Sequence, residues 1–469
     1  MNKIPDALKQ TFLYGTSIAL MKGVSLIMLP FIAHHLTAED FGRLEVISTL
    51  AIIGSILVGM GLEDTLFRFA GTCRDHDQRK RLAAEIFSLT IVIGSIAGIA
   101  GWMTADFISS WIPGNPTTYQ VRLVMLMLAL EGVIAIPLGW LRMRNKANVF
   151  FISTTGRALM QAALVLLLLH YNRGVEGVLE AGLIAAISQA LFVGILHFRD
   201  TGFHFGRETA SRSFLYSLPI VGSGLVAFAL NGLDRWILAD YTSLNDVAHF
   251  GVAAKFSLAV VLLLQPFGMW WSPRRFEVLN EPEGIKKSTQ FITLGITLAL
   301  IITVMVGLSA PLLITWLMPD SYAMSAQYVA GLVLVMLLKE LTELVNIGCF
   351  IGKTTLTQML INIIGAIVGI LCMLWWTPAN GVWGVIFALL VAQSLRLLLF
   401  YYASQRVLPM PYPTRSLALL TGICIGLLML GTQLDTNIQQ LVITIIGLAT
   451  LLGCALSLKL IPAPAVLVK

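Results

Sequence analysis

The chain has 469 residues, of which 57% are hydrophobic and only 12% are charged. Because about a quarter of the residues in soluble domains are charged, this composition excludes an ordinary soluble protein and predicts that lipid surrounds most of the chain. The net charge of +6 does not indicate a nucleic-acid partner, since the Lys and Arg residues are spread over short segments and form no basic domain.

Fourteen apolar runs follow one another along the chain. Most are long enough to cross the hydrocarbon core of a bilayer, which needs about 20 helical residues. The sequence therefore predicts an all-α polytopic membrane protein with about 14 transmembrane helices. In chain order the runs cover residues 11–33, 43–67, 82–104, 120–141, 149–171, 177–197, 213–239, 251–271, 288–316, 327–347, 355–376, 382–402, 416–433 and 439–460.

The positive charges of the connecting segments alternate along the chain. One set of loops, together with both tails, holds almost all of these Lys and Arg residues, whereas the other set holds only Arg43 and Arg173. Basic loops mark the cytoplasmic side of a membrane. We therefore expect both termini in the cytoplasm and a first run that is retained as a helix rather than cleaved as a signal peptide.

Two short motifs recur in the two halves of the first twelve runs. Phe-Leu-Tyr follows Thr11 in the first run and Ser213 in the seventh. A Ser/Thr-x-x-Asp pattern, typical of a helix N-terminus, begins at Thr37 and again at Ser243, and Phe-Gly follows it at the start of the next run. Chance recurrence of an apolar tripeptide is the alternative explanation.

Six runs per repeat is an even number, so the two halves share one orientation. The repeat predicts two six-helix lobes related by an axis along the membrane normal, as in parallel-repeat transporters, with a substrate cavity between them. The predicted lobes are residues 1–205 and 206–403, and residues 404–469 form two additional transmembrane helices.

A known family resembles this chain over essentially its whole length. The similarity is carried by the run with Pro30 and by the segments 36–42, 231–238 and 250–255. They are similar to the oligosaccharide flippases of bacterial polysaccharide biosynthesis, the Wzx-type branch of the MOP transporter superfamily. The resemblance implies a MATE-like fold in the bacterial inner membrane, with twelve core helices and often two added ones.

The resemblance also implies a function. Such a protein is not an enzyme: it moves an undecaprenyl-diphosphate-linked oligosaccharide from the cytoplasmic to the periplasmic leaflet by alternating access. The product serves O-antigen lipopolysaccharide, exopolysaccharide or another surface polysaccharide. Expected partners are the lipid-linked oligosaccharide and membrane lipids, with a polysaccharide polymerase and a chain-length regulator as further candidates.

Charged residues inside the runs point to the same chemistry. A charge at the centre of a membrane helix costs about 2.5 to 3.5 kcal/mol on the insertion scale, so the deeper ones should face protein or water. A cationic wall suits a diphosphate, because charge-assisted N–H bonds to phosphate replace the hydration that the headgroup loses. The candidate substrate-binding residues are Lys22, Arg157, Asn231, Asp234, Arg235 and Lys255.

Acidic residues in the runs are candidates for coupling or gating, with a proton or sodium as the coupling ion. These candidates, together with one lysine, are Glu63, Glu131, Lys339, Glu340 and Glu343. Structural ion pairs are the alternative for some of them: Glu131 with Arg157, and Arg235 with Asp234 or with an acid of another helix.

Two further classes of function remain open: a MATE-like exporter of cations or a lipid II flippase, and a membrane glycan polymerase or ligase. An exporter of cations should line its cavity with acids and aromatic residues, whereas basic residues are prominent at mid-depth here. A membrane glycan polymerase or ligase usually needs a sizeable periplasmic loop, and none is expected here. The five cysteines stand singly, without C-x-x-C or a His partner at ligand spacing, so we expect neither a metal nor a cofactor.

Overall fold

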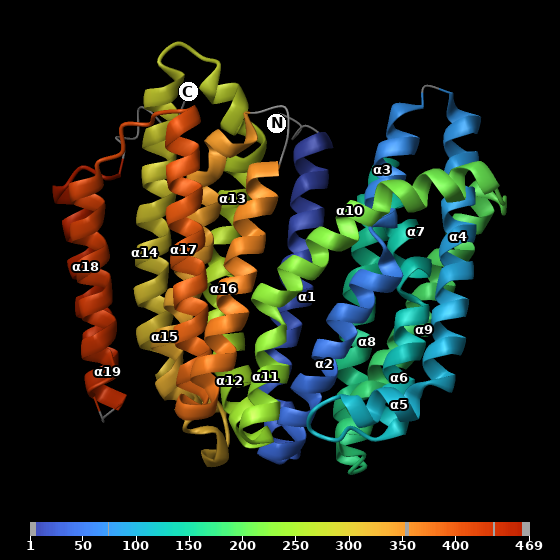
Figure 1. Ribbon diagram of the computed structural model, residues 1–469, viewed down its shortest axis with the longest axis horizontal. Coiled ribbons are helices and arrows are strands. Elements are labelled where there is room, and N and C mark those ends of the chain that lie inside the picture. Colours follow the sequence, from blue (N-terminus) through green and yellow to red (C-terminus); the bar gives the residue numbers. More distant parts are fainter. Residues whose placement is uncertain (1–5, 74, 352–355, 435–436, 462–469) are drawn as a thin grey trace, which may run out of the picture. The chain divides into compact units, whose positions relative to one another are not determined.

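A computed structural model of the chain describes residues 6–73, 75–351, 356–434 and 437–461. Within these ranges the chain is helical and contains no β-strand. The contacts between residues divide it into two compact units, residues 1–247 and 248–469 (Figure 1).

The first unit contains eleven complete helices among the described residues. They are α1 (Asp6–His35), α2 (Ala38–Gly59), α3 (Leu62–Thr72), α4 (His76–Met103), α5 (Ala105–Trp111), α6 (Thr118–Ala129), α7 (Glu131–Met143), α8 (Ala147–His170), α9 (Gly174–Thr201), α10 (Arg207–Asn231) and α11 (Leu233–Tyr241).

The second unit begins just after the first turn of α12. Its elements are α12 (Leu244–Ser257), α13 (Ala259–Leu279), α14 (Gly284–Leu317), the 3-10 helix η1 (Asp320–Tyr322), α15 (Ser325–Val345), the 3-10 helix η2 (Asn346–Phe350), α16 (Leu356–Asn380), α17 (Val382–Val407), α18 (Thr414–Gly431) and α19 (Asn437–Ser457).

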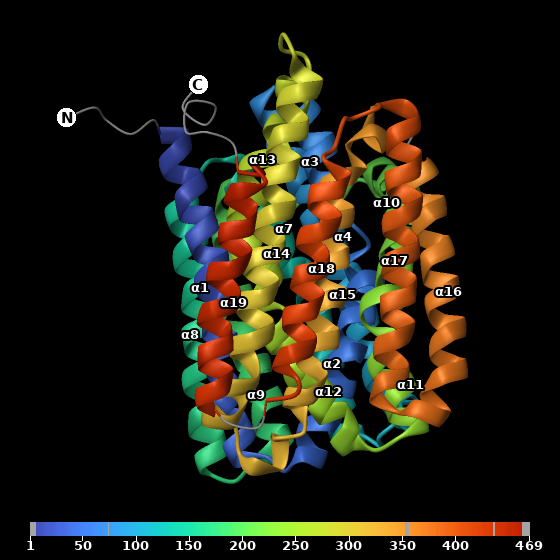
Figure 2. The same cartoon turned by 90° about the vertical axis from the view of Figure 1, so that its left-hand side faces the viewer.

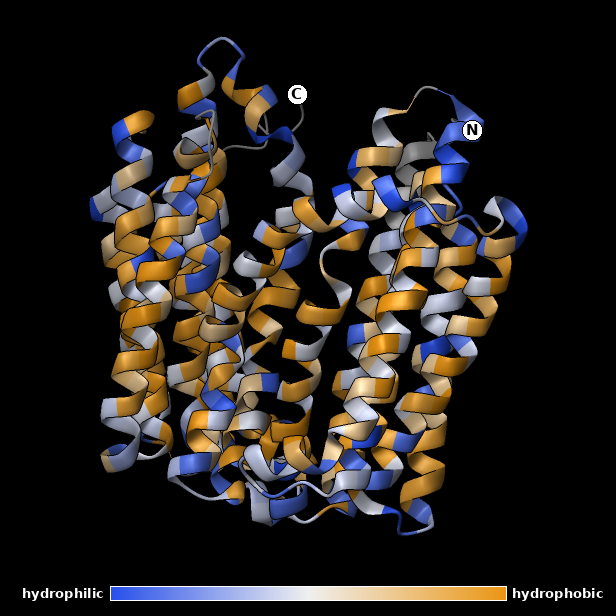
Figure 3. Cartoon of the chain, turned by 45° about the vertical axis from the view of Figure 1, so that its right-hand side comes forward, coloured by the Kyte–Doolittle hydropathy of each residue, from blue (hydrophilic) through white to orange (hydrophobic). Residues whose placement is uncertain are grey.

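Fourteen membrane helices are expected, and the structure supports this fold class. In the described part of the chain, thirteen helical segments are long and apolar enough to cross a membrane, and each coincides with one predicted run. The remaining run, 327–347, is helix α15, which carries Lys339, Glu340 and Glu343 near its end. Figure 3 shows hydrophobic residues along the middle of the helices and hydrophilic residues gathered at their ends.

The two repeated capping motifs adopt the same local structure. The Thr37 hydroxyl accepts a hydrogen bond from the backbone N–H of Asp40 at 3.1 Å, and the Ser243 hydroxyl accepts one from Asp246 at 3.1 Å. Each bond satisfies a backbone donor at a helix start that has no partner within the helix. The predicted caps of α2 and α12 are therefore confirmed.

The boundary between the units lies later in the chain than the predicted repeat boundary at 205/206. Helices α10 and α11 pack against α2, and α10 also packs against α3 and α4. Figure 1 shows α10 running obliquely across these helices. The repeat boundary itself stays a prediction from the sequence.

Breaks interrupt several of the predicted runs. Between α2 and α3, Met60 and Gly61 both have positive φ angles, 46° and 60°. A Cβ atom at Gly61 would lie 2.6 Å from the Ile220 side chain, so glycine suits both the backbone and the packing here. A second break, at Leu130, separates α6 from α7. Each break is followed at once by an acidic residue inside the membrane span, Glu63 after the first and Glu131 after the second.

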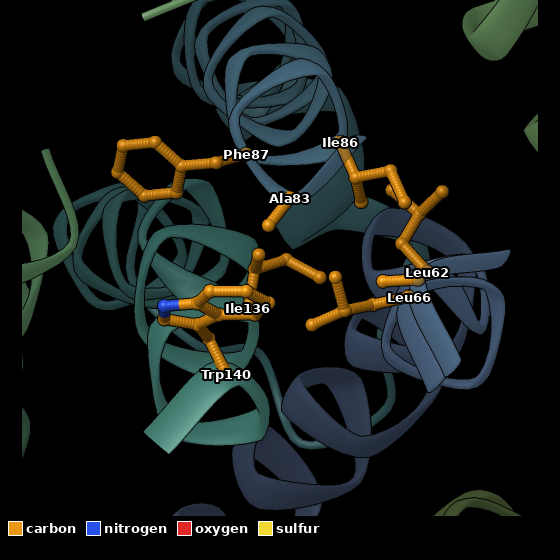
Figure 4. Packing of buried hydrophobic residues seen from close by; sticks show 8 residues of the cluster. Leu62, Leu66, Ala83, Ile86, Phe87, Ile136 and Trp140 are labelled. Carbon is orange, nitrogen blue, oxygen red and sulfur yellow. The ribbon is translucent and has the colours of Figure 1, made fainter. Parts of the chain in front are cut away.

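A core of buried side chains joins α3, α4 and α7. Leu62 and Leu66 of α3 pack with Ile86 of α4 and with Ile136 and Trp140 of α7, and all five are at most 2% exposed. In Figure 4 these side chains converge between the three helices. Close van der Waals packing of this kind is what holds membrane helices together, because lipid offers no hydrophobic driving force between them. The core therefore fixes α3 and α7 side by side.

In the second unit, α14 packs against α13, α15, α18 and α19. A Cβ atom at Gly307 of α14 would lie 2.3 Å from the Leu428 side chain of α18, and one at Gly431 of α18 would lie 2.3 Å from the Leu308 side chain of α14. Glycine allows two membrane helices to approach closely. Figure 2 shows α18 and α19 beside α14, so the two predicted C-terminal helices form one packed layer of this unit.

Candidate functional site

A cavity of about 660 Å³ lies within the first unit, lined by residues of α1, α3, α7, α8 and α9. This is the usual size of a small-molecule site. Five charged side chains face it: Lys22, Glu63, Glu131, Arg142 and Arg157. Four of them are site candidates from the sequence, and the fold brings them together from four different helices.

Helices α1 and α8 form one wall of the cavity. Tyr14 and Phe150 meet edge to face with ring centroids 5.1 Å apart, and the hydroxyls of Ser17 and Thr154 share a hydrogen bond. This packing places Lys22, near the middle of α1, at the cavity. Lys22 is half-buried, and within the described ranges no hydrogen bond or ion pair engages its ammonium group.

Arg157 projects from the middle of α8 and is held by neutral groups. Its guanidinium donates a 2.9 Å hydrogen bond to Gln189 of α9, and the Gln189 amide donates a 3.1 Å bond to the Ser153 hydroxyl. Among the described residues no direct contact joins Arg157 to Glu131, but the two opposite charges are near enough to attract each other, and both line the cavity. Arg157 therefore keeps its positive charge available at the cavity.

Arg142 is a cavity residue that the sequence argument did not select. It directly follows the predicted run 120–141 and has the position of a basic residue in a cytoplasmic loop, but its guanidinium pairs with the Glu63 carboxylate. The rings of Phe67 and Phe150 lie 5.2 and 5.8 Å from it. Its position about three helical turns after Glu131, and so on the same face of α7, is the sequence signal that could have found it.

A second cavity of about 250 Å³ adjoins the first break in the chain. Its lining includes Gly61, Ile220 and Gly224, and it shares Glu63 and Glu131 with the larger cavity. The two acidic residues therefore lie at the junction of both cavities. This is where the structure places two of the coupling or gating candidates, whose role stays a prediction.

The candidates of α10 and α11 lie elsewhere in the first unit and line neither cavity. The Arg235 guanidinium bonds to Glu45 of α2 and to Asp234, each at 3.1 Å. The neighbouring Trp236 indole donates to the Val46 carbonyl at 3.1 Å. Asn231 caps its own helix by donating to the Ala227 carbonyl at 2.8 Å. The structure therefore shows the ion pairing that the sequence offered as the alternative to substrate binding for Arg235: it pairs with Asp234 and with an acid of another helix, Glu45.

The remaining candidates lie in the second unit. Lys255 is half-buried near the end of α12. Lys339, Glu340 and Glu343 occupy the last two turns of α15, where Glu343 accepts a 3.0 Å hydrogen bond from Asn346. No group of His, Cys, Asp or Glu in the described part of the chain is arranged to hold a metal ion.

Solved structures of other membrane transporters have a fold similar to that of this chain. The lipid II flippase MurJ, in an inward closed conformation, matches with a TM-score of 0.72 and 13% identity over 94% of this chain and 97% of MurJ. An inward-facing multidrug MATE transporter of the MOP superfamily matches with a TM-score of 0.59 and 16% identity over 84% of this chain and 94% of that one. At these identities the likeness shows the fold alone.

A third structure, the MATE multidrug transporter DinF-BH, matches with a TM-score of 0.55 and 17% identity over 86% of this chain and 97% of that one. A comparison with curated protein sequences finds no match. The family model described as polysaccharide biosynthesis protein matches residues 7–279, more than half of the chain. The chain therefore belongs to the family of polysaccharide biosynthesis proteins, and its all-α fold is similar to that of MurJ and the MATE transporters.

Proposed function

We propose that this protein is a flippase that moves an undecaprenyl-diphosphate-linked oligosaccharide from the cytoplasmic to the periplasmic leaflet by alternating access. The observation that carries the proposal is the charge of the larger cavity, where Lys22, Arg142 and Arg157 face two carboxylates, one of which is already paired. The cargo would supply a surface polysaccharide.

The chemistry of the cavity suits a diphosphate headgroup. Lys22 offers an ammonium group with three donors, and Arg157 offers a planar guanidinium that Gln189 holds in place. Charge-assisted bonds from such groups to phosphate oxygens are about twice as strong as bonds between neutral groups. They would offset the loss of hydration as the headgroup leaves the membrane surface.

Other functions fit the cavity less well. An exported cation would be repelled by three basic side chains, and among the described residues of this cavity only Glu131 offers a carboxylate without a direct ion-pair contact. A lipid II flippase remains the second candidate, because the lipid II flippase MurJ shares the fold and such a cargo would suit the same basic lining. We propose proton or sodium coupling through Glu63 and Glu131, at the junction of the two cavities.

Deleting the protein is expected to leave lipid-linked repeat units intact, unpolymerised and on the cytoplasmic leaflet. A flippase changes the leaflet of its substrate without covalent change, so the length of the units should not alter. The measurement is the access of an externally added glycan-modifying enzyme to the units in spheroplasts. Units that are modified from outside yet remain unpolymerised would instead favour the polymerase or ligase. Accumulated lipid II would favour the second candidate.

Both termini are expected in the cytoplasm of a bacterium, with the protein in its inner membrane. Reporter fusions after residues 76, 145, 205 and 280 should score as cytoplasmic, and fusions after residues 112 and 245 as periplasmic, because the Lys and Arg residues concentrate in the first set of loops. A reversed pattern across the first six spans would contradict this topology and the direction of transport.

A further inference from the structure

The ion pair between Arg142 and Glu63 differs from the other charges of the larger cavity. Arg157 bonds to a neutral amide, and within the described residues Lys22 has no partner. Arg142 alone among the three cations contacts a carboxylate that also lines the cavity. One guanidinium that could meet the cargo is therefore already occupied by an acidic group of the protein.

Both members of this pair are accessible. The Arg142 side chain is 41% exposed and the Glu63 side chain 33% exposed. By contrast, the two acidic side chains that pair with Arg235, Glu45 and Asp234, are only 5% and 6% exposed. An accessible ion pair is weak, because water competes for both charges. The pair can therefore open without leaving a buried charge uncompensated.

The surroundings hold Arg142 in place when the pair opens. The rings of Phe67 and Phe150 lie against its guanidinium, and Tyr14 packs on Phe150. Within the described ranges the Tyr14 hydroxyl is buried and has no hydrogen-bond partner, so it is available as a further donor. A phosphate group that replaced the Glu63 carboxylate would meet a guanidinium already oriented by aromatic rings.

We propose that Glu63 is an internal competitor of the cargo: the diphosphate displaces Glu63 from Arg142 on binding, and Glu63 returns to Arg142 when the cargo leaves. This inference rests on the proposed function and assigns Arg142 as a third cationic ligand of the headgroup. A carboxylate can play this role because it accepts the same paired N–H bonds from a guanidinium as a phosphate does.

The competition serves release. A cavity in which Arg142 was always open would hold a diphosphate more tightly. Pairing with Glu63 lowers the apparent affinity in proportion to the small fraction of protein in which Arg142 is open.

Binding of farnesyl diphosphate to the purified full-length protein tests this exchange by a double-mutant cycle. Glu63→Gln should tighten binding about fivefold or more, because the competitor is removed, and Arg142→Gln should weaken it by a similar factor. In the double variant Glu63→Gln/Arg142→Gln, the Glu63 substitution should lose its effect, since no guanidinium remains to compete for.

Glu131→Gln is the matched control, because it removes a carboxylate from the same cavity without breaking the pair. It should change affinity to the same extent whether Arg142 is present or not. If Glu63→Gln also changes the affinity equally with and without Arg142, its effect comes from the net charge of the cavity, and the proposed competition is refuted. Failure of both the wild type and Glu63→Gln to bind farnesyl diphosphate would instead overturn the proposed function and this inference with it.

Discussion

Replacing Lys22 with alanine is expected to abolish surface glycan while the protein stays in the membrane at normal abundance. Within the described part of the chain Lys22 has no ion pair, so its removal leaves no opposite charge uncompensated. The substitution is expected to weaken binding of the cargo. A hydrogen bond to a charged group contributes about 1.5 to 3 kcal/mol, which corresponds to roughly tenfold or more in affinity.

Surface glycan and membrane-fraction abundance are measured together in the same cells. Lys22→Arg should restore part of the glycan, because arginine keeps the charge but meets phosphate with a different geometry. Lys286→Ala serves as the control, since this lysine is exposed at the start of α14 and pairs only loosely with Glu283 at 3.5 Å. Full glycan output from Lys22→Ala would remove Lys22 from the site.

Replacing Arg235 with alanine is expected to deplete the protein itself. The substitution removes the Arg235 guanidinium from the Glu45 and Asp234 carboxylates, which are buried at 5% and 6% exposure. Breaking a buried ion pair in this way costs about 3 to 5 kcal/mol, a large share of the roughly 5 to 15 kcal/mol by which proteins are stable. Abundance in the membrane fraction and thermal stability in detergent should both fall.

Two further variants separate this structural role from contact with the cargo. Arg235→Lys should recover part of the stability, and Arg235→Met combined with Glu45→Met and Asp234→Asn should recover more of it, because these three buried side chains are then uncharged. An Arg235→Ala protein that is abundant and stable yet inactive would show the opposite, namely that Arg235 acts on the cargo as first predicted from its depth.

The membrane helices could be predicted because hydropathy is a local property. Each predicted run is helical in the structure, although breaks divide several of them, and the caps at Thr37 and Ser243 form as their motifs indicate. The positions of Lys22, Glu63, Glu131 and Arg157 inside the runs could be predicted for the same reason, since the runs are defined by local composition. The expectation that such charges avoid lipid agrees with their place at one cavity.

The partners of these charges could not be predicted, because they depend on how each helix is rotated and where it breaks. Arg235 and Glu45 lie far apart in the chain and meet only because α11 packs against α2. Arg142 has the sequence features of an ordinary loop charge, and the core between α3 and α7 brings it to Glu63.

The sequence by itself determined that this is a multi-pass membrane protein, the order of its apolar helical runs and which charged residues lie inside them, since all of these follow from local composition. Only the tertiary structure decided which cations face the cavity, which are locked into buried pairs and which carboxylate pairs with Arg142. Those outcomes depend on packing between helices from distant parts of the chain, where a change of one residue in helix register moves a side chain by about 100° around the axis.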